Sequence, residues 1–417
     1  MIPPGAEILG SHAPGGDRAA FSLVEQPARV ALAHDWLVGL RGGEAVLEEI
    51  AAVVRSRHTL SCVYTMFSDG RPLAPHIDAA PRSVARLGRL PGASTRLRRW
   101  LLPLYPFAVG ELARRLAADH ARQPIDVLFS TSSAAIKGLR PPPGVPHICY
   151  CHAPARYLWS QTDAYSRGSG GGARALGLNL FAPRLRGWDR RTAANVSTFL
   201  ANSSHTARQI REFYGRDALV VHPPVRTDFF TPDAGEPRDG SWLYVGALEP
   251  YKRVDLAILA ANGARHQLVV VGRGTQAESL RAIAGPTVRF LGHVSDDELR
   301  RLYRRAGVLL FPQTEDFGIT AVEAQSCGTP VAAFRAGGAL DSVVEGVTGA
   351  FFDAPEPGAL AAAARSALDL PHLGGAARAN AERFSRGVFT EAIAAVLEKT
   401  LQNRRDQDTS LPRASPG

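Results

Sequence analysis

The chain has 417 residues, 45% of them hydrophobic, which is enough for two globular domains, and it contains no apolar run of the about 20 residues that a membrane-spanning helix needs. Its four cysteines are too few for a disulfide framework, which favours a reducing, cytoplasmic location. The net charge of +9 indicates an anionic partner: nucleic acid, an acidic membrane face or a phosphorylated substrate.

The first predicted elements follow a tail. Residues 1–28 are rich in Gly, Pro and Ala, and we expect them to be a disordered tail. They lack the basic start and apolar core of a secretory signal, so we expect the protein to remain cytoplasmic. RVALAHDW (29–36) then predicts a buried strand, LVGLRGG (37–43) a loop, and EAVLEEIAAVV (44–54) a helix. This order of elements is typical of the start of a doubly wound α/β domain.

Basic and apolar residues are interleaved between residues 86 and 107. The segment contains Arg86, Arg89, Arg96, Arg98 and Arg99 together with Leu87, Leu90, Leu97, Trp100, Leu101, Leu102, Tyr105 and Phe107. Two interpretations stay open at this stage. The segment is either an interfacial element on an anionic membrane or an amphipathic helix of the N-terminal domain with its arginines in water.

Strand-like runs recur along the rest of the chain, at 60–66, 125–131, 147–152 and 197–203, and again, after the Pro- and Gly-rich segment 231–240, at 241–248, 266–272, 288–294, 307–312 and 329–334. We therefore predict two facing doubly wound, Rossmann-like α/β domains, residues 29–225 and 226–385, with an interdomain cleft at the carboxyl ends of their strands. A helix at 386–402 is expected to pack back on the N-terminal domain, and residues 403–417 to form a disordered tail.

His152 ends the strand-like run HICYCH, in which His147, Cys149 and Cys151 also occur and raise the alternative of a metal site. Strand alternation places residues 147, 149 and 151 on one face and His152 on the other, so the four side chains do not converge easily. We therefore expect no metal site here, and a buried core histidine remains the plain alternative for His152.

The segment 307–335 predicts an anion site at a strand-to-helix junction. Val308 to Phe311 has the character of a buried strand and Ile319 to Ser326 that of a helix, so Glu315 falls in the loop and Glu323 in the helix. The first backbone N–H groups of that helix lack intrahelical partners and point at the crevice; they belong to Phe317, Gly318, Ile319 and Thr320. Carboxylates beside such an anion site suit a ligand that also offers hydroxyl groups, as a nucleotide-sugar does.

Two adjacent cations, Lys252 and Arg253, follow the first strand of the second domain in VGALEPYKRVDLAI. At that place they could neutralise a diphosphate leaving group.

The spacing of seven residues between Glu315 and Glu323, with FGIT between them, CGTPVAA after them and EGVTGAFF near residue 350, resembles the Glu-x7-Glu motif of retaining family-4 glycosyltransferases of GT-B architecture. The resemblance covers roughly residues 29 to 400. It implies that Glu315 faces the transferred sugar, that Glu323 holds the ribose hydroxyls and that Lys252 binds the donor phosphate.

The same resemblance assigns parts to the N-terminal domain. His152 is expected beside the donor sugar, as a hydrogen-bonding and site-shaping residue, and Gly42 and Gly43 match a loop that acceptor and donor phosphate approach closely. Arg156 and Tyr157 could contact the acceptor or be structural.

The chain departs from the family pattern at two positions. Ala247 stands where an arginine usually precedes the lysine by five residues, so that either Arg253 substitutes or one cation suffices, and Arg226 stands where the family has the aspartate of PPVD.

For the reaction, the resemblance implies a front-face transfer with retention of configuration. The departing phosphate helps to deprotonate the acceptor hydroxyl. Lys252 and the amides of residues 317–320 stabilise the charge that develops on this phosphate. Neither a cofactor nor a metal is required. The segments HDWLVGLRGGE, YCHAPARYLW and PYKRVD are most similar to bacterial polysaccharide mannosyltransferases, which implies GDP-mannose as donor, with a UDP-hexose as the alternative. The acceptor would be a polyprenyl-diphosphate-linked glycan, with the enzyme peripheral at the inner face of the cell membrane.

Three other classes of protein are the alternatives to this interpretation. A nicotinamide oxidoreductase is disfavoured because no G-x-G-x-x-G turn follows the first strand. A nucleic-acid-binding protein is disfavoured because no recognised module accompanies the scattered arginines. A non-catalytic nucleotide-binding GT-B protein stays open because of Ala247.

Overall fold

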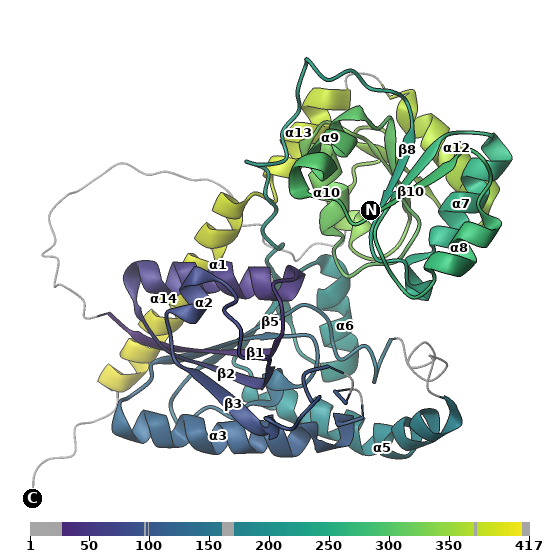
Figure 1. Cartoon of the computed structure of the whole chain (residues 1–417). Coiled ribbons are helices and arrows are strands. Elements are labelled where there is room, and N and C mark those ends of the chain that lie inside the picture. Colours follow the sequence, from purple (N-terminus) through teal and green to yellow (C-terminus); the bar gives the residue numbers. More distant parts are fainter. Residues whose placement is uncertain (1–26, 96, 99, 161–170, 371–372, 411–417) are drawn as a thin grey trace, which may run out of the picture.

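The computed structural model describes residues 27–410 except residues 96, 99, 161–170 and 371–372. Figure 1 shows two α/β domains one above the other, with the N-terminal domain below. Each domain has its own parallel sheet and its own hydrophobic clusters. The predicted architecture of two doubly wound domains is therefore confirmed.

The N-terminal sheet has the strand order β3-β2-β1-β4-β5-β6-β7, and every neighbouring pair is parallel. Its strands are β1 (Arg29–Leu37), β2 (Thr59–Ser68), β3 (Arg82–Gly88), β4 (Val127–Ser132), β5 (His147–Cys151), β6 (Thr198–Ala201) and β7 (Ala218–Val220). The helices of this domain are α1 (Gly42–Arg57), α2 (Pro75–Asp78), α3 (Tyr105–Arg122), α5 (Gly171–Thr192) and α6 (Ser204–Tyr214). The reversal of strand order beside β1 is a topological switch point, where α/β sheets bind ligands.

The C-terminal sheet has the strand order β10-β9-β8-β11-β12-β13, again parallel throughout. Its strands are β8 (Trp242–Val245), β9 (Leu268–Val271), β10 (Val288–Gly292), β11 (Val308–Phe311), β12 (Val331–Phe334) and β13 (Gly349–Phe352). Its helices are α7 (Val254–Ala264), α8 (Ala277–Ile283), α9 (Asp296–Arg305), α10 (Ile319–Ser326), α11 (Ala339–Ser342), α12 (Pro357–Leu368) and α13 (Leu373–Glu382).

Three strands, β3, β7 and β13, were not predicted. All three are edge strands, and an edge strand needs less continuous apolar sequence than a central one because one side is unpaired. β3 carries two arginines in seven residues, and β13 is only four residues long and begins with glycine.

The last helix, α14 (Arg386–Ser410), returns to the N-terminal domain and lies along it, as the yellow helix beside α1 in Figure 1 shows. Four apolar side chains spaced by four residues, Phe389, Ile393, Leu397 and Leu401, are buried in the cluster that also contains residues of β1 and α1. Fully burying each such side chain stabilises the fold by about 1.5–3 kcal/mol at most. The expected tail at 403–417 is wrong for residues 403–410, because the helix continues through them. Residues 411–417, like residues 1–26 of the expected N-terminal tail, lie outside the described part.

The segment 86–107 is not one amphipathic helix. It begins in β3, passes through turns, forms the 3-10 turn Leu102–Leu104 and only then enters α3. Pro91, Gly92 with φ of 75° and Pro103 interrupt any helix, because proline lacks the N–H donor and a positive φ breaks the helical ladder. Arg96 and Arg99 lie outside the described residues.

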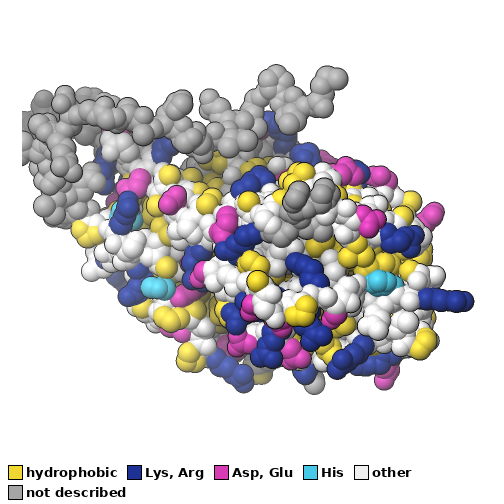
Figure 2. Space-filling model, turned by 90° about the horizontal axis from the view of Figure 1, so that it is seen from above, with side chains coloured by type: hydrophobic (Ala, Val, Ile, Leu, Met, Phe, Trp, Pro, Cys, Tyr) yellow, Lys and Arg dark blue, Asp and Glu magenta, His cyan; other side chains and the backbone are white. Residues whose placement is uncertain are grey.

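This segment nevertheless presents apolar side chains to solvent. Phe107 is 74% exposed and Trp100 is 53% exposed, and Leu90, Leu97 and Leu104 are exposed as well. Arg86 and Arg89 are exposed beside them in the chain. By contrast, basic and acidic side chains are interspersed on the face shown in Figure 2. None of the helices in the described ranges is long and apolar enough to cross a bilayer.

The two domains contact each other directly. The backbone N–H of Ser204, at the start of α6, donates to Asp341 Oδ2 of α11 at 2.6 Å, and His222 Nε2 lies 3.2 Å from the same oxygen. These contacts join the segments that follow β6 and β7 of the N-terminal domain to α11 of the C-terminal domain.

Candidate active site

The loop between β11 and α10 is held in a narrow conformation by glycines. Gly318, the residue before α10, has φ of 94°, and a Cβ there would lie 2.5 Å from Phe311 Cζ. A Cβ on Gly338 would lie 2.3 Å from Phe317 Cα, and the N–H of Gly338 donates to Glu315 O at 2.8 Å. Only glycine fits at both places, and the loop therefore presents its backbone in one orientation.

The predicted anion site lies at the end of this loop. Within the described residues, the N–H groups of Phe317, Gly318, Ile319 and Thr320 have no hydrogen-bond acceptor in the protein, whereas that of Ala321 donates to Gly318 O at 3.1 Å. Four unpaired donors at the positive end of a helix attract a phosphate.

Lys252 and Glu315, which are 63 positions apart in the sequence, form an ion pair. Lys252 ends the 3-10 turn Pro250–Lys252 after β8, and Glu315 follows β11, the strand adjacent to β8. The pKa of the Lys252 ammonium is lowered to about 8, chiefly by burial and also by the nearby Arg156, while Asp316 opposes the shift. A cation and a carboxylate from two separate sequence motifs thus meet beside the anion site.

Arg253 pairs with a different carboxylate from the one that Lys252 contacts. It adopts a left-handed backbone conformation with φ of 51° at the start of α7, and its Nε lies 3.3 Å from Asp255 Oδ1. Its side chain is 39% exposed. The predicted second phosphate-binding cation is therefore paired with a different carboxylate, on its own helix.

Glu323 lies on α10 and accepts a hydrogen bond from the hydroxyl of Tyr303, with 3.0 Å between Tyr303 OH and Glu323 Oε2. Burial raises the pKa of the Glu323 carboxyl to about 7, although the Tyr303 hydroxyl and Arg226 both favour the ionised form. Arg226, the residue that departs from the family pattern, pairs with Asp296 at 2.7 Å. The sequence analysis missed Tyr303 because a tyrosine in an amphipathic helix usually indicates a core position.

On the N-terminal side, Gly42, Gly43 and His152 come together. A Cβ on Gly43 would lie 3.6 Å from His152 Nε2 and 3.5 Å from His34 Cε1, and one on Gly42 would lie 3.9 Å from Ile319 Cδ1 of α10. The glycine pair therefore lies between His152 and the start of α10, with no side chain filling the space.

The His152 ring is neutral near pH 7. Burial lowers its pKa to about 3, and His34 and Arg156 act in the same direction. In the described structure its Nε2 is buried without a hydrogen-bond partner. Such an unpaired buried polar atom is costly unless a ligand group completes it.

His34 is a site neighbour that the sequence analysis missed. Its Nδ1 lies 2.5 Å from Thr131 Oγ1, its Nε2 lies 4.0 Å from Glu44 Oε1, and its ring is T-shaped to that of His152. The adjacent Asp35 accepts four backbone N–H bonds of 2.7 to 2.9 Å from residues 133–136, which fixes the end of β1 against the loop after β4. The run HDW at the end of a buried strand was the available signal.

His147, by contrast, is a core residue. Its Nε2 lies 2.7 Å from Ser130 Oγ and its Nδ1 lies 3.2 Å from Asn195 O, and burial lowers its pKa to about 3. No three His, Cys, Asp or Glu side chains within the described ranges are arranged to hold a metal ion.

Arg156 of the N-terminal domain forms an ion pair with Asp316 of the C-terminal domain. Asp316 is buried and is the immediate neighbour of Glu315. The sequence analysis proposed only an acceptor contact or a structural role for Arg156, because nothing local reveals a partner 160 positions away.

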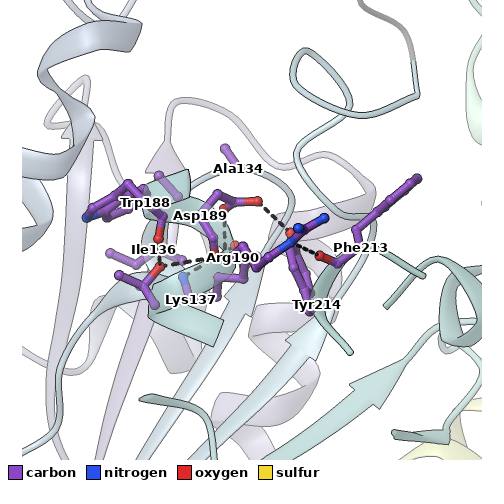
Figure 3. Close-up of polar contacts among 12 residues, drawn as sticks. Ala134, Ile136, Lys137, Trp188, Asp189, Arg190, Phe213 and Tyr214 are labelled. Atoms are coloured by element: carbon purple, nitrogen blue, oxygen red, sulfur yellow. Dashed lines mark hydrogen bonds and ion pairs between the residues drawn. The ribbon is translucent and has the colours of Figure 1, made fainter. Parts of the chain in front are cut away.

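The segment that carries Arg156 is anchored by the buried pair in Figure 3, in which Lys137 Nζ lies 2.8 Å from Asp189 Oδ1. Asp189 Oδ2 accepts hydrogen bonds from Trp159 Nε1 at 2.7 Å and from the hydroxyl of Tyr214 at 2.9 Å. Arg186 Nε donates to Leu158 O at 2.6 Å. Together these buried polar contacts fix the backbone after β5.

The comparisons with known families match both domains. Residues 40–229 match the family described as Glycosyltransferase Family 4, and residues 233–384 match the family described as Glycosyl transferases group 1. The chain is 35% identical over 251 residues to the D-inositol 3-phosphate glycosyltransferase of Acidothermus cellulolyticus, covering 52% of this chain and 56% of the relative. It is 32% identical over 260 residues to D-inositol 3-phosphate glycosyltransferase 2 of Catenulispora acidiphila, covering 53% and 60%. The chain thus spans about half the length of the curated relatives it matches.

Solved structures share the fold at low sequence identity. The sucrose-phosphate synthase of Thermosynechococcus elongatus superposes with a TM-score of 0.67 at 18% identity, over 92% of this chain and 100% of that chain. HepE of Anabaena, solved in complex with UDP, gives a TM-score of 0.61 at 19% identity, over 89% and 100%. These likenesses establish the GT-B fold for the part of the chain that the structure describes.

Proposed function

We propose that this chain, a glycosyltransferase with a family 4 domain and a group 1 domain in a GT-B arrangement, transfers a hexose from a nucleotide-sugar to an acceptor hydroxyl with retention of configuration. The observation that carries the proposal is the contact of Lys252 with Glu315 beside the free amides of residues 317–320. A cation, a helix N-terminus and hydroxyl-accepting carboxylates suit the diphosphate, the sugar and the ribose of one ligand.

In this proposal each group has one task. Lys252 and the α10 amides stabilise the charge of the leaving diphosphate, and Glu323 accepts from the ribose hydroxyls. Glu315 and His152 hold the transferred sugar, and the glycine pair leaves room for the acceptor beside it. The departing phosphate takes the proton of the acceptor hydroxyl, so that no protein base and no metal is needed.

For the donor we propose GDP-mannose, on the similarity of the 34–44, 150–159 and 250–255 segments to bacterial mannosyltransferases. The names of the relatives above do not specify mannose. HepE of Anabaena was solved with UDP-glucose, which favours a UDP-hexose as the second candidate.

For the acceptor we propose a polyprenyl-diphosphate-linked glycan. The interleaved arginines and the exposed Trp100 and Phe107 support peripheral contact with an anionic membrane at the cytoplasmic face. A phosphorylated cyclitol is the second candidate, because the two curated relatives are named for D-inositol 3-phosphate.

The testing experiment is a thermal-shift panel of GDP, UDP, ADP, their sugar conjugates and NAD, with and without EDTA. A ligand that binds only the native state raises its apparent stability. A shift with GDP and GDP-mannose that survives chelation supports a metal-independent mannosyltransferase. A shift with UDP ligands alone changes the donor, and one with NAD alone contradicts the proposed function.

A further inference from the structure

The diphosphate of the proposed donor needs positive charge around it. A nucleoside diphosphate leaving group carries at least two negative charges, yet Ala247 replaces one of the two cations expected beside it, and Arg253 is paired with Asp255. Lys252 and the α10 amides alone would face the whole of that charge. Residues from the C-terminal domain therefore leave the diphosphate one cation short.

A second cation reaches this place from the other domain. Arg156 pairs with Asp316, whose neighbour Glu315 pairs with Lys252, so two cations and two carboxylates meet in front of α10. Arg156 is near enough to Lys252 to disfavour its charged form. Two cations held close together in a half-buried site are stabilised by an anion between them.

We propose that Arg156 supplies the second diphosphate-binding cation from the N-terminal domain, exchanging Asp316 for the donor phosphates when the nucleotide-sugar binds. This inference rests on the proposed function, and it assigns to Arg156 the task for which the sequence offered either Arg253 or no second cation. The planar guanidinium can contact two phosphate oxygens at once, which the Lys252 ammonium cannot.

Two features fit this assignment. The segment carrying Arg156 is fixed by the bond from Trp159 to Asp189, and Asp189 is itself held by its pair with Lys137 (Figure 3), so little backbone freedom is lost when Arg156 binds a ligand. Because the donor would then be held by both domains at once, its binding would also draw the cleft together.

The test compares GDP with GMP, and UDP with UMP, by titration calorimetry on the full chain. In Arg156→Gln we expect diphosphate affinity to fall about 10- to 100-fold while monophosphate affinity changes little, since charged hydrogen bonds to a phosphate are lost. Arg156→Lys should retain part of the preference. Arg404→Gln, which removes an arginine paired with Asp126 at the far end of the N-terminal strands, is the matched control and should bind like wild type.

Asp316→Asn separates ligand binding from domain contact. If Arg156 binds phosphate, removing its competing carboxylate leaves diphosphate affinity unchanged or higher. If the pair only joins the domains, diphosphate affinity falls equally in Asp316→Asn and Arg156→Gln, and the inference is overturned. It is also overturned if Arg253→Gln, and not Arg156→Gln, loses the diphosphate preference. If wild type binds no nucleoside diphosphate at all, the proposed function fails first.

Discussion

The hydroxyl of Tyr303 donates to Glu323 Oε2 at 3.0 Å, which places a hydrogen-bond donor against the carboxylate proposed to hold the ribose. Because burial raises the pKa of Glu323 to about 7, the carboxylate changes charge near neutral pH. The hydrogen bond from the Tyr303 hydroxyl is one of the interactions that keep the pKa of Glu323 from rising further.

Nucleotide affinity should therefore increase with pH through about 7, since only ionised Glu323 is a pure acceptor for ribose hydroxyls. Tyr303→Phe should move this increase to higher pH, because the bond that favours the ionised form is lost. Calorimetric affinities for GDP and UDP between pH 6 and 8.5 measure the effect. The 2′,3′-dideoxy nucleotides are the control and should lack the part of the pH dependence that comes from Glu323; an equal dependence would rule out Glu323 as its source.

Glu315→Ala and Lys252→Ala should each reduce kcat/KM for transfer by about 100-fold or more while the fold is kept, since each removes a group proposed to contact the donor in the transition state. Transfer to acceptor is measured together with thermal unfolding. Arg404→Gln is again the control. Wild-type-like turnover of both variants would remove the site as described.

Acid should weaken the fold through His147 and His152, whose pKa values burial lowers to about 3. Both residues are neutral in the folded state, so as pH falls below about 6.5 the unfolded chain binds protons that the native chain cannot, and the free energy of unfolding decreases by up to about 1.4 kcal/mol per pH unit for each histidine. Urea unfolding between pH 7 and pH 5 measures this slope. In His147→Gln the slope should be smaller by one proton, and an unchanged slope would contradict the origin given.

Leu397→Ala should lower the free energy of unfolding by about 2–5 kcal/mol, because it leaves a cavity where α14 meets the N-terminal core. Urea denaturation provides the value. The exposed Lys399, two residues later on the same helix, supplies the matched variant Lys399→Ala, for which a change within about 0.5 kcal/mol is expected. Equal effects would mean that α14 does not stabilise the domain.

Trp100→Ala with Phe107→Ala should weaken sedimentation with vesicles that contain anionic lipid by about tenfold, since both exposed rings would enter the interface. Salt should weaken wild-type binding further, because arginines contribute to it. Leu259→Ala, an exposed apolar change in the C-terminal domain, is the control. Vesicle binding by the double variant at the wild-type level would place the membrane contact elsewhere or exclude it.

Local sequence patterns predicted most of the helices and strands correctly. They failed where one pattern is compatible with more than one local structure. The alternation of buried strands and helices predicted both sheets, because parallel strands read as continuous apolar runs. The interleaved arginines and leucines of 86–107 left a membrane-interfacial element and an amphipathic helix open. Pro91, Gly92 and Pro103 divide the segment into a strand, turns and the start of α3. The chain after 402 continues as helix although its composition is polar.

The sequence by itself determined the two domains and the Glu315–Glu323 junction, since both depend on residues within one turn or one strand-loop-helix unit. Only the tertiary structure decided that Lys252 meets Glu315, that Tyr303 bonds to Glu323, and that Arg156 pairs with Asp316. The physical reason is that such contacts depend on strand order and on how the domains are joined. Hydrophobic periodicity specifies which face of an element is buried, but not which distant side chain it will meet.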